Sequence, residues 1–303
     1  MFLKKILIKI LFPNKYRSFK EKEGTKKTRD IFKTKYEPYI NEVQKLINNK
    51  KDLNFLHSGH SGDIINILPV IKELSKNHSC NLFIKTNKKI TTNYENHPGK
   101  EFYINKKIFI MLEPLLKFQS YIRDVKEFDG QNIDINFDIF RELPINISFD
   151  NLRYASQITG VQPDFDKKYI DVPKKSEFKD KIVIQRTFRY RNQFINYKFI
   201  DKFENILFIG LKKEYEDLRL EIPNLKFYDC KDFLEMATII NSSKFFIGNS
   251  SLGFPIAEAL KVPRLLEACP YFPAAQPHGK NAYDFYYQTH FEKFFKILLN
   301  IKN

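Results

Sequence analysis

The second half of the sequence alternates short apolar runs with helix-like stretches, and this alternation strongly limits the possible folds. The apolar runs are KIVIQRT, NILFIGL, LKFYDC, KFFIGNSS and VPRLLEA. The helix-like stretches between them are residues 196–204, EYEDLRLEI, DFLEMATIINSS and GFPIAEALK. Runs that are apolar on both faces are typical of buried parallel strands. The sequence therefore predicts an α/β fold, a parallel sheet with helices on its faces.

The first half contains a second unit of the same kind. A strand, LNFLHS, precedes a loop and the helix DIINILPVIKELSKN, and the strand CNLFIKT follows. An extended stretch punctuated by Pro163 and Pro173 separates the two units. We therefore expect a basic arm (1–51), a first Rossmann-like domain (52–172) and a second (173–303). The last helix, near Phe285–Leu299, is amphipathic and is a candidate to pack back across the two halves.

The positive charge is concentrated at the N-terminus. Residues 1–51 hold fifteen Lys or Arg and five Asp or Glu, a net +10 of the chain's +15. A helix is predicted near Tyr36–Asn48. The first residues, MFLKKILIKILFP, place apolar side chains on one helical face with lysines beside it, a pattern that suits an anionic membrane surface. They are too short to span a bilayer. A frayed arm, or a helix packed on its own protein, is the alternative.

Composition also limits the partners and the compartment. Nucleic acid is not an expected partner, because the basicity lies in the arm and no aromatic-rich basic motif of the RNA-binding type is present. Three cysteines without paired spacing predict neither a zinc site nor a disulfide framework. They favour a cytoplasmic location, on the inner face of the membrane if the arm binds lipid.

A polar loop, HSGHSGD, joins the first strand to its helix. Ligands of an open α/β sheet bind beyond the carboxyl ends of the strands, where this loop must lie. Asp63 could act there as a general base on an acceptor hydroxyl, or it could only cap the helix. His60 and His57 could assist proton transfer or contact a phosphate, or simply be solvated. The expected acceptor loop comprises His57, Ser58, Gly59, Ser61 and Gly62.

The second half offers two candidate phosphate-binding segments at the same sheet edge. Arg186, Arg189 and Arg191 follow its first strand, and guanidinium groups suit bidentate phosphate binding. An ordinary basic loop is the alternative. The second segment is the turn before a helix, where backbone N–H groups and the helix dipole favour anions. Any tight strand-to-helix turn would use such residues, but their position beside the arginines strengthens the interpretation as a phosphate site. The turn comprises Gly248, Asn249, Ser250, Ser251 and Gly253.

Two carboxylates are candidates for binding sugar or ribose hydroxyls. Glu267 follows the next strand, at its carboxyl end, and is the better placed of the two. Glu258 lies in the intervening helix and could instead face solvent. No D-x-D pair of the kind that holds Mg²⁺ near phosphates stands out, so no metal site is expected.

These segments carry a family resemblance. GDIINILPVIKEL resembles the G-D-[IV]-x-x-x-x-P segment of the glycosyltransferase family 9 heptosyltransferases, with Gly62, Asp63 and Pro69 at matching spacing. FIGNSSLGFPIAEALKVPRLLEACP resembles that family's donor segment. In the family's pattern an Asp, a Gly and a His stand where this chain has Ser250, Leu252 and Pro255. The donor sugar is therefore left open.

The resemblance implies a GT-B fold, in which two Rossmann-like domains face each other across a cleft. It implies a nucleotide-diphosphate sugar as donor substrate, a glycan or lipid-linked acceptor, no separate cofactor, and Asp63 as the base. Two other functions remain open. One is a nucleotide-sugar epimerase of the UDP-N-acetylglucosamine 2-epimerase type, and the other is a non-catalytic GT-B scaffold that binds glycan or a membrane partner.

Overall fold

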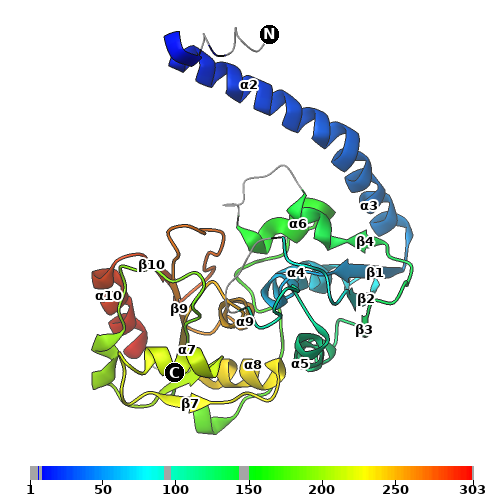
Figure 1. Ribbon diagram of the computed structural model, residues 1–303. Helices are drawn as coiled ribbons and strands as arrows, with labels where there is room; N and C mark the ends of the chain where they lie inside the picture. The colour runs from blue at the N-terminus through cyan, green and yellow to red at the C-terminus, as the bar shows by residue number, and fades with distance from the viewer. Residues whose placement is uncertain (1–5, 7–8, 92–96, 143–149, 302–303) are drawn as a thin grey trace.

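The chain forms two parallel β-sheets with helices packed around them (Figure 1). The computed structural model describes residues 6, 9–91, 97–142 and 150–301. The first sheet has the strand order β3-β2-β1-β4, and the second has the order β10-β9-β8-β5-β6-β7. In both sheets the order reverses beside the first strand of the unit, as in a doubly wound fold. Ligands of such sheets bind at that reversal, beyond the carboxyl ends of the strands.

The first sheet belongs to the N-terminal half. Its strands are β1 (Asp52–His57), β2 (Ser79–Ile84), β3 (Asp124–Glu127) and β4 (Ile135–Asn136). Its helices are α4 (Ser61–Leu74), α5 (Lys106–Lys117) and α6 (Tyr154–Thr159), with 3₁₀ turns η2 (Phe137–Arg141) and η3 (Asn151–Arg153). The reversal lies between β1 and β4, so the β1–α4 loop and η2 meet at one sheet edge.

The second sheet belongs to the C-terminal half. Its strands are β5 (Ile182–Gln185), β6 (Ile206–Ile209), β7 (Lys226–Tyr228), β8 (Phe245–Asn249), β9 (Arg264–Glu267) and β10 (Ala282–Phe285). Its helices are α7 (Lys212–Leu218), α8 (Phe233–Ser242), α9 (Gly253–Leu260) and α10 (Gln288–Leu299), with 3₁₀ turns η4 (Ser176–Phe178) and η5 (Lys198–Lys202). The helix expected over residues 196–204 is only the short turn η5. The reversal lies between β5 and β8, which carry the two candidate phosphate segments.

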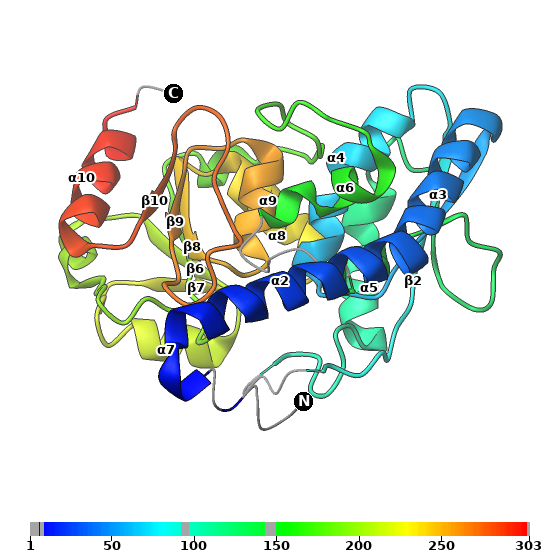
Figure 2. The same cartoon turned by 90° about the horizontal axis from the view of Figure 1, so that it is seen from above.

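The two halves pack directly against each other. Helix α4 contacts α9, and α5 contacts α8 (Figure 2). One hydrophobic cluster runs through both halves, from residues such as Ile64 and Leu112 to Ile240 and Phe254. A Cβ on Gly62 would lie 3.3 Å from Cγ of Pro255, so the first turns of α4 and α9 touch. This packing brings the two reversal points together.

Helix α10 corrects one expectation. It does not cross back over the first half but covers β9 and β10 of its own sheet (Figure 1). Phe291 stacks on Phe285 with ring centroids 4.1 Å apart, and Phe295 and Leu298 are buried in the same cluster. The apolar face of α10 is therefore used within the second half.

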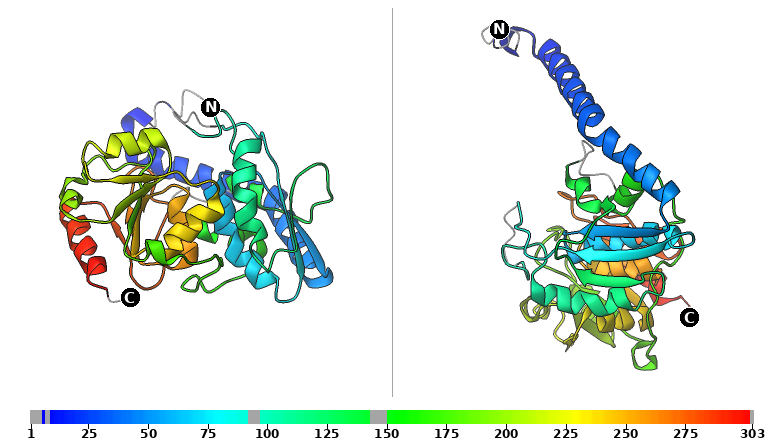
Figure 3. Two further views of the ribbon diagram at one scale, coloured as in Figure 1. Left: turned by 90° about the horizontal axis from the view of Figure 1, so that it is seen from below. Right: turned by 90° about the vertical axis from the view of Figure 1, so that its right-hand side faces the viewer.

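The N-terminal arm projects from the body (Figure 3). It comprises α2 (Pro13–Ile31), a π-helical turn η1 (Phe32–Tyr36) and α3 (Glu37–Asn49). Helix α3, predicted from the sequence, buries Val43 against the first half, whereas α2 has no buried residue. Most of the apolar segment at residues 2–11 lies outside the described residues. Among those described, no helix is both long enough and apolar enough to cross a bilayer.

Candidate active site

A cavity of about 1350 Å³ lies between the two halves. Its first-half wall comes from the start of α4, from α5, from residues 97–103 and from the end of η2. Its second-half wall comes from the segments after β5 and β8, from α8 and from residues 272–276. Of the expected site residues, those that line it are His60, Ser61, Gly62, Asp63, Arg189, Ser250, Ser251 and Glu258.

Asp63 stands at the first turn of α4 and lines the cavity. Its Oδ2 accepts a hydrogen bond from the His60 backbone N–H (3.1 Å), so it does cap the helix. The same oxygen accepts a bond from Nη2 of Arg141 (2.6 Å). Among the described residues, Oδ1 makes no hydrogen bond.

Arg141 is a site residue that the sequence analysis missed. It ends η2, and its guanidinium lies 4.6 Å from the ring centroid of Tyr103 and 4.2 Å from that of Phe140. Such stacking fixes the plane of the group. A Cβ on Gly59 would come within 2.5 Å of Arg141 Nη2 and 2.8 Å of Asp63 Oδ2, so a larger residue there would disturb this ion pair.

Much of the expected acceptor loop is buried beneath the cavity rather than exposed to it. Asp138 accepts a hydrogen bond from the Ser58 backbone N–H (2.8 Å) and another from the Ser58 hydroxyl. Lys88 contacts the same carboxylate at 3.0 Å. Burial opposes ionisation of Asp138, but nearby His57 and the bonds from Ser58 outweigh it and lower its pKa to about 2. His57 is itself fully enclosed, and its Nδ1 accepts the Gly59 N–H. We therefore correct the roles of His57, Ser58 and Gly59: they shape the loop from below.

His60 reaches the cavity beside a second histidine. Its Nδ1 lies 3.1 Å from Nε2 of His97, and the edge of the Tyr103 ring packs on it at 4.9 Å between centroids. Burial lowers the pKa of His60 to about 4 and that of His97 to about 3. Arg189, which belongs to the other half, contributes to both shifts in the same direction. Both imidazoles are therefore neutral at neutral pH.

The turn after β8 lies between that strand and α9, as the sequence predicted, but several of its groups already bind other residues of the protein. The Gly253 N–H donates to Oε1 of Gln185 (2.6 Å), and this close approach leaves no room for a Cβ at position 253. Asn249 is fully buried, and its side chain bonds the backbone of Thr187 and Arg189. Gly248 packs against Phe246 and the Gln185 backbone. Of the turn, Ser250 and Ser251 face the cavity.

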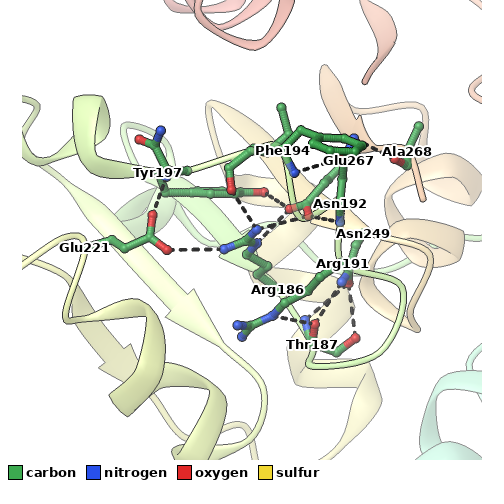
Figure 4. Close-up of polar contacts among 12 residues, drawn as sticks. Arg186, Thr187, Arg191, Asn192, Phe194, Tyr197, Glu221, Asn249, Glu267 and Ala268 are labelled. Carbon is green, nitrogen blue, oxygen red and sulfur yellow. Dashed lines mark hydrogen bonds and ion pairs between the residues drawn. The ribbon is translucent and has the colours of Figure 1, made fainter. Parts of the chain in front are cut away.

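Arg186 is corrected by the structure, because it lies in a buried network rather than in the cavity (Figure 4). Its Nε donates to Oε2 of Glu267 at 2.7 Å, and its Nη2 donates to Oε1 at 3.1 Å. Tyr197 donates its hydroxyl to the same carboxylate (2.9 Å). Only 3% of Arg186 and none of Glu267 is exposed, so neither can bind a ligand without unmaking this pair.

The other two arginines differ from each other. Arg191 donates through Nη1 to Asp217 (2.6 Å) and through Nε to the Thr187 carbonyl (3.1 Å), and it is not part of the cavity wall. Arg189 lines the cavity. Of the three arginines proposed for phosphate binding, the structure therefore places Arg189 at the cavity.

Glu258 borders the cavity but is nearly buried, with its carboxylate engaged elsewhere. Its Oε2 accepts from Nε of Arg264 (2.7 Å), and its Oε1 contacts Lys261. The sugar-binding role expected for Glu258 is therefore corrected, because its carboxylate is held by these partners. The same correction applies to Glu267, whose carboxylate is held by Arg186. Within the part of the chain that the structure describes, no three His, Cys, Asp or Glu side chains converge as metal ligands.

Comparison with known proteins finds similarity in structure but not in sequence. No family model and no curated protein sequence matches this chain. A glycosyl transferase of family 9 from Veillonella parvula superposes with a TM-score of 0.53 at 12% identity, over 84% of this chain and 90% of that chain. The E. coli heptosyltransferase WaaC, solved with ADP, gives a TM-score of 0.56 at 8% identity, over 82% of this chain and 99% of that chain. WaaC with ADP-2-deoxy-2-fluoro heptose gives 0.53 at 9% identity. The chain therefore has the GT-B fold of the glycosyltransferases that it resembles.

Proposed function

We propose that this protein is a glycosyltransferase that moves a sugar from a nucleotide-diphosphate donor to a hydroxyl of a glycan or lipid-linked acceptor. One observation carries the proposal. Asp63, whose Oδ1 makes no hydrogen bond among the described residues, lies on one wall of the interdomain cavity, and Arg189 with the turn before α9 lies on the other. A base and an anion-binding wall are the two parts that such a transfer needs.

The first half supplies the base. Oδ1 of Asp63 takes the proton of the acceptor hydroxyl while Arg141 and the His60 N–H hold Oδ2. The acceptor oxygen then forms a bond to the anomeric carbon of the donor sugar. The bond from that carbon to the diphosphate breaks, and its electron pair leaves with the nucleoside diphosphate. The held oxygen keeps the carboxylate oriented.

The second half supplies the anion site for the leaving diphosphate. Arg189 provides a full positive charge, and the end of the α9 dipole points to the cavity. The Gly253 N–H donates to Gln185 and the Ser251 N–H donates to the Asn249 carbonyl, so among the described contacts the backbone N–H groups of Ser250 and Leu252 remain for phosphate oxygens. With these groups the transfer we propose proceeds without a metal ion. The solved WaaC structures, which hold ADP and an ADP-sugar analogue, motivate a nucleotide at this position.

Asp63→Asn tests the base. We expect turnover to fall by about 10²–10⁴-fold, the usual contribution of a general base, while donor affinity changes little. Glu73→Gln is the matched control, since Glu73 lies near the other end of α4 and pairs with exposed Lys76. Donor candidates come from a thermal-shift screen of nucleotides, because a ligand of the native state raises its apparent stability.

The outcomes separate the alternatives. Undiminished turnover in Asp63→Asn would remove Asp63 from the role. Interconversion of nucleotide sugars without an acceptor would indicate an epimerase. Absence of transfer and hydrolysis with every donor that binds would indicate a scaffold.

We further propose that the N-terminal arm holds the enzyme on the inner, anionic face of a membrane. Helix α2 has no buried residue and projects from the body (Figure 3). Ile10, Leu11 and Phe12, which directly precede it in the chain, are exposed. Ten Lys or Arg and three Asp or Glu lie in residues 9–36. A basic surface with apolar side chains matches an anionic lipid headgroup layer.

Vesicle sedimentation tests the arm. The full chain should bind phosphatidylglycerol vesicles and not phosphatidylcholine vesicles. Replacing Lys26 and Lys27 by Gln should weaken binding about tenfold or more, at roughly 1 kcal/mol per basic residue. The matched control replaces Lys213 and Lys293, exposed lysines of the second half. Equal binding of both vesicle types, or an equal effect of both pairs, would contradict the proposal.

A further inference from the structure

Two histidines from separate segments share a hydrogen bond at the cavity wall, and their neighbours fix where the protons lie. The backbone N–H of Gly99 donates to Nδ1 of His97 at 3.0 Å. A nitrogen that accepts this bond carries no hydrogen, so neutral His97 has its hydrogen on Nε2. That Nε2 faces Nδ1 of His60 at 3.1 Å.

The hydrogen bond from His97 also fixes the position of the hydrogen on the His60 ring. Because Nε2 of His97 is the donor of the shared bond, Nδ1 of His60 is the acceptor. A neutral His60 then carries its hydrogen on Nε2. Its one lone pair that could take up a proton is already occupied by His97. His60 is therefore unsuited to act as a base at this cavity, although it lies beside Asp63.

Charged groups surround His60, and its protonation state affects the neighbouring Asp63 carboxylate. Asp63 on its own helix favours the charged imidazole. Burial is the largest factor that opposes the charged form, and Arg189 from the second half, Arg141 from η2 and His57 below the loop oppose it as well. A charged His60 would attract the Asp63 carboxylate and compete with the acceptor hydroxyl for it. Keeping His60 neutral therefore keeps Asp63 available.

We propose that His97 is a positioning residue that locks His60 in its neutral, Nε2-protonated form and so reserves Asp63 as the proton acceptor. The inference rests on the proposed function for its catalytic consequence, but the tautomer itself does not. The sequence analysis did not single out His97, which lies 37 residues from His60 along the chain.

Nitrogen-15 NMR of the histidine rings tests the tautomer on the full chain without substrate. We expect His60 and His97 to show neutral, Nε2-protonated rings at pH 7 and to stay neutral down to about pH 5. In His97→Leu the Nδ1 lone pair of His60 is released, so the pKa of His60 should rise above its wild-type value, although burial still keeps it below the ordinary 6.5. In His97→Gln the side-chain amide can still donate to Nδ1 of His60, and the low pKa of His60 should be largely restored.

Transfer rates give the second readout. In His97→Leu the acid limb of the turnover should lie at a higher pH than in the wild type, because the pKa of His60 rises, and His97→Gln should return the limb to its wild-type position. A wild-type His60 with its hydrogen on Nδ1, or a His97→Leu variant with the wild-type His60 titration, would overturn the inference. If no donor supports transfer, the proposed function fails while the ring spectra still decide the tautomer.

Discussion

The loop after β1 and the loop after β5 occupy the same place in the two halves, yet they use their charged residues differently. Both follow the first strand of a Rossmann-like unit and reach the reversal point of its sheet. In the first loop, Asp63 lines the cavity, and within the described part of the chain its Oδ1 makes no hydrogen bond. In the second, Arg186 and Arg191 are paired with Glu267 and Asp217, and neither lines the cavity.

The difference lies in what the neighbouring elements supply. Glu267 ends β9 and Asp217 lies in α7, and both point at the arginine loop. Burying an arginine without a counter-ion is costly in free energy, so a buried arginine forms an ion pair where a carboxylate lies within reach. Of the described cations, Arg141 pairs with Asp63, and it contacts a single carboxylate oxygen, Oδ2. A charged residue at the carboxyl edge of the sheet is thus available to a ligand only where the other residues of the protein leave some of its hydrogen-bonding atoms without a partner.

Breaking the buried pair of the second half should give the largest effect. Glu267→Gln leaves the Arg186 charge without its counter-ion and should lower the free energy of unfolding by about 3–5 kcal/mol. Urea denaturation measures it. Glu221→Gln is the control, because Glu221 is part-exposed and contacts Arg186 at 3.4 Å. If Arg186 instead served the donor, Glu267→Gln would alter donor affinity rather than stability.

Acid should weaken the first half through its buried histidines. Burial lowers the pKa of His57 from 6.5 to about 4. Between these values the unfolded chain binds the proton and the folded chain does not, so stability falls as the pH falls. From pH 6.5 to pH 5 the loss from His57 alone is about 2 kcal/mol. His57→Asn can still accept the Gly59 N–H and should have a shallower dependence of the thermal midpoint on pH. An equally steep dependence would assign the effect to other groups.

Arg189→Gln should distinguish Arg189, which lines the cavity, from Arg186 and Arg191 of the same loop, which do not. Losing a charged contact to phosphate should weaken nucleotide binding by about tenfold or more. Isothermal titration with the nucleotide found in the screen measures the affinity. Arg219→Gln, at an exposed position after α7, should leave affinity unchanged. Equal weakening by both variants would indicate a general charge effect.

Gly62→Ala should give the smallest effect and reports on the contact between the loops. The added Cβ would lie 3.3 Å from Pro255, so α4 and α9 would have to separate by a few tenths of an ångström. We expect less than about 1 kcal/mol of destabilisation, with a measurable change in KM because both walls of the cavity shift. Gly24→Ala, where nothing lies within 4 Å of the new Cβ, is the control. An unchanged KM would mean that the cavity tolerates the shift.

The sequence determined the elements and their order, because strand and helix periodicity are local properties. The runs around β1, β2 and β5–β9 were all predicted, as were α4, α8 and α9. The GD motif placed Asp63 at the start of a helix for the same reason. The GT-B fold followed from two such units and the resemblance they carry, and the structural comparison confirms it.

The partners of the charged residues were decided by the tertiary structure alone. Arg141 lies 78 residues from Asp63 along the chain, and Glu267 lies 81 residues from Arg186. No local pattern reports such pairs, because they form only when separate strands end at one sheet edge. Whether a side chain faces a ligand or a counter-ion depends on that convergence, and so does the burial that keeps His60 and His97 neutral.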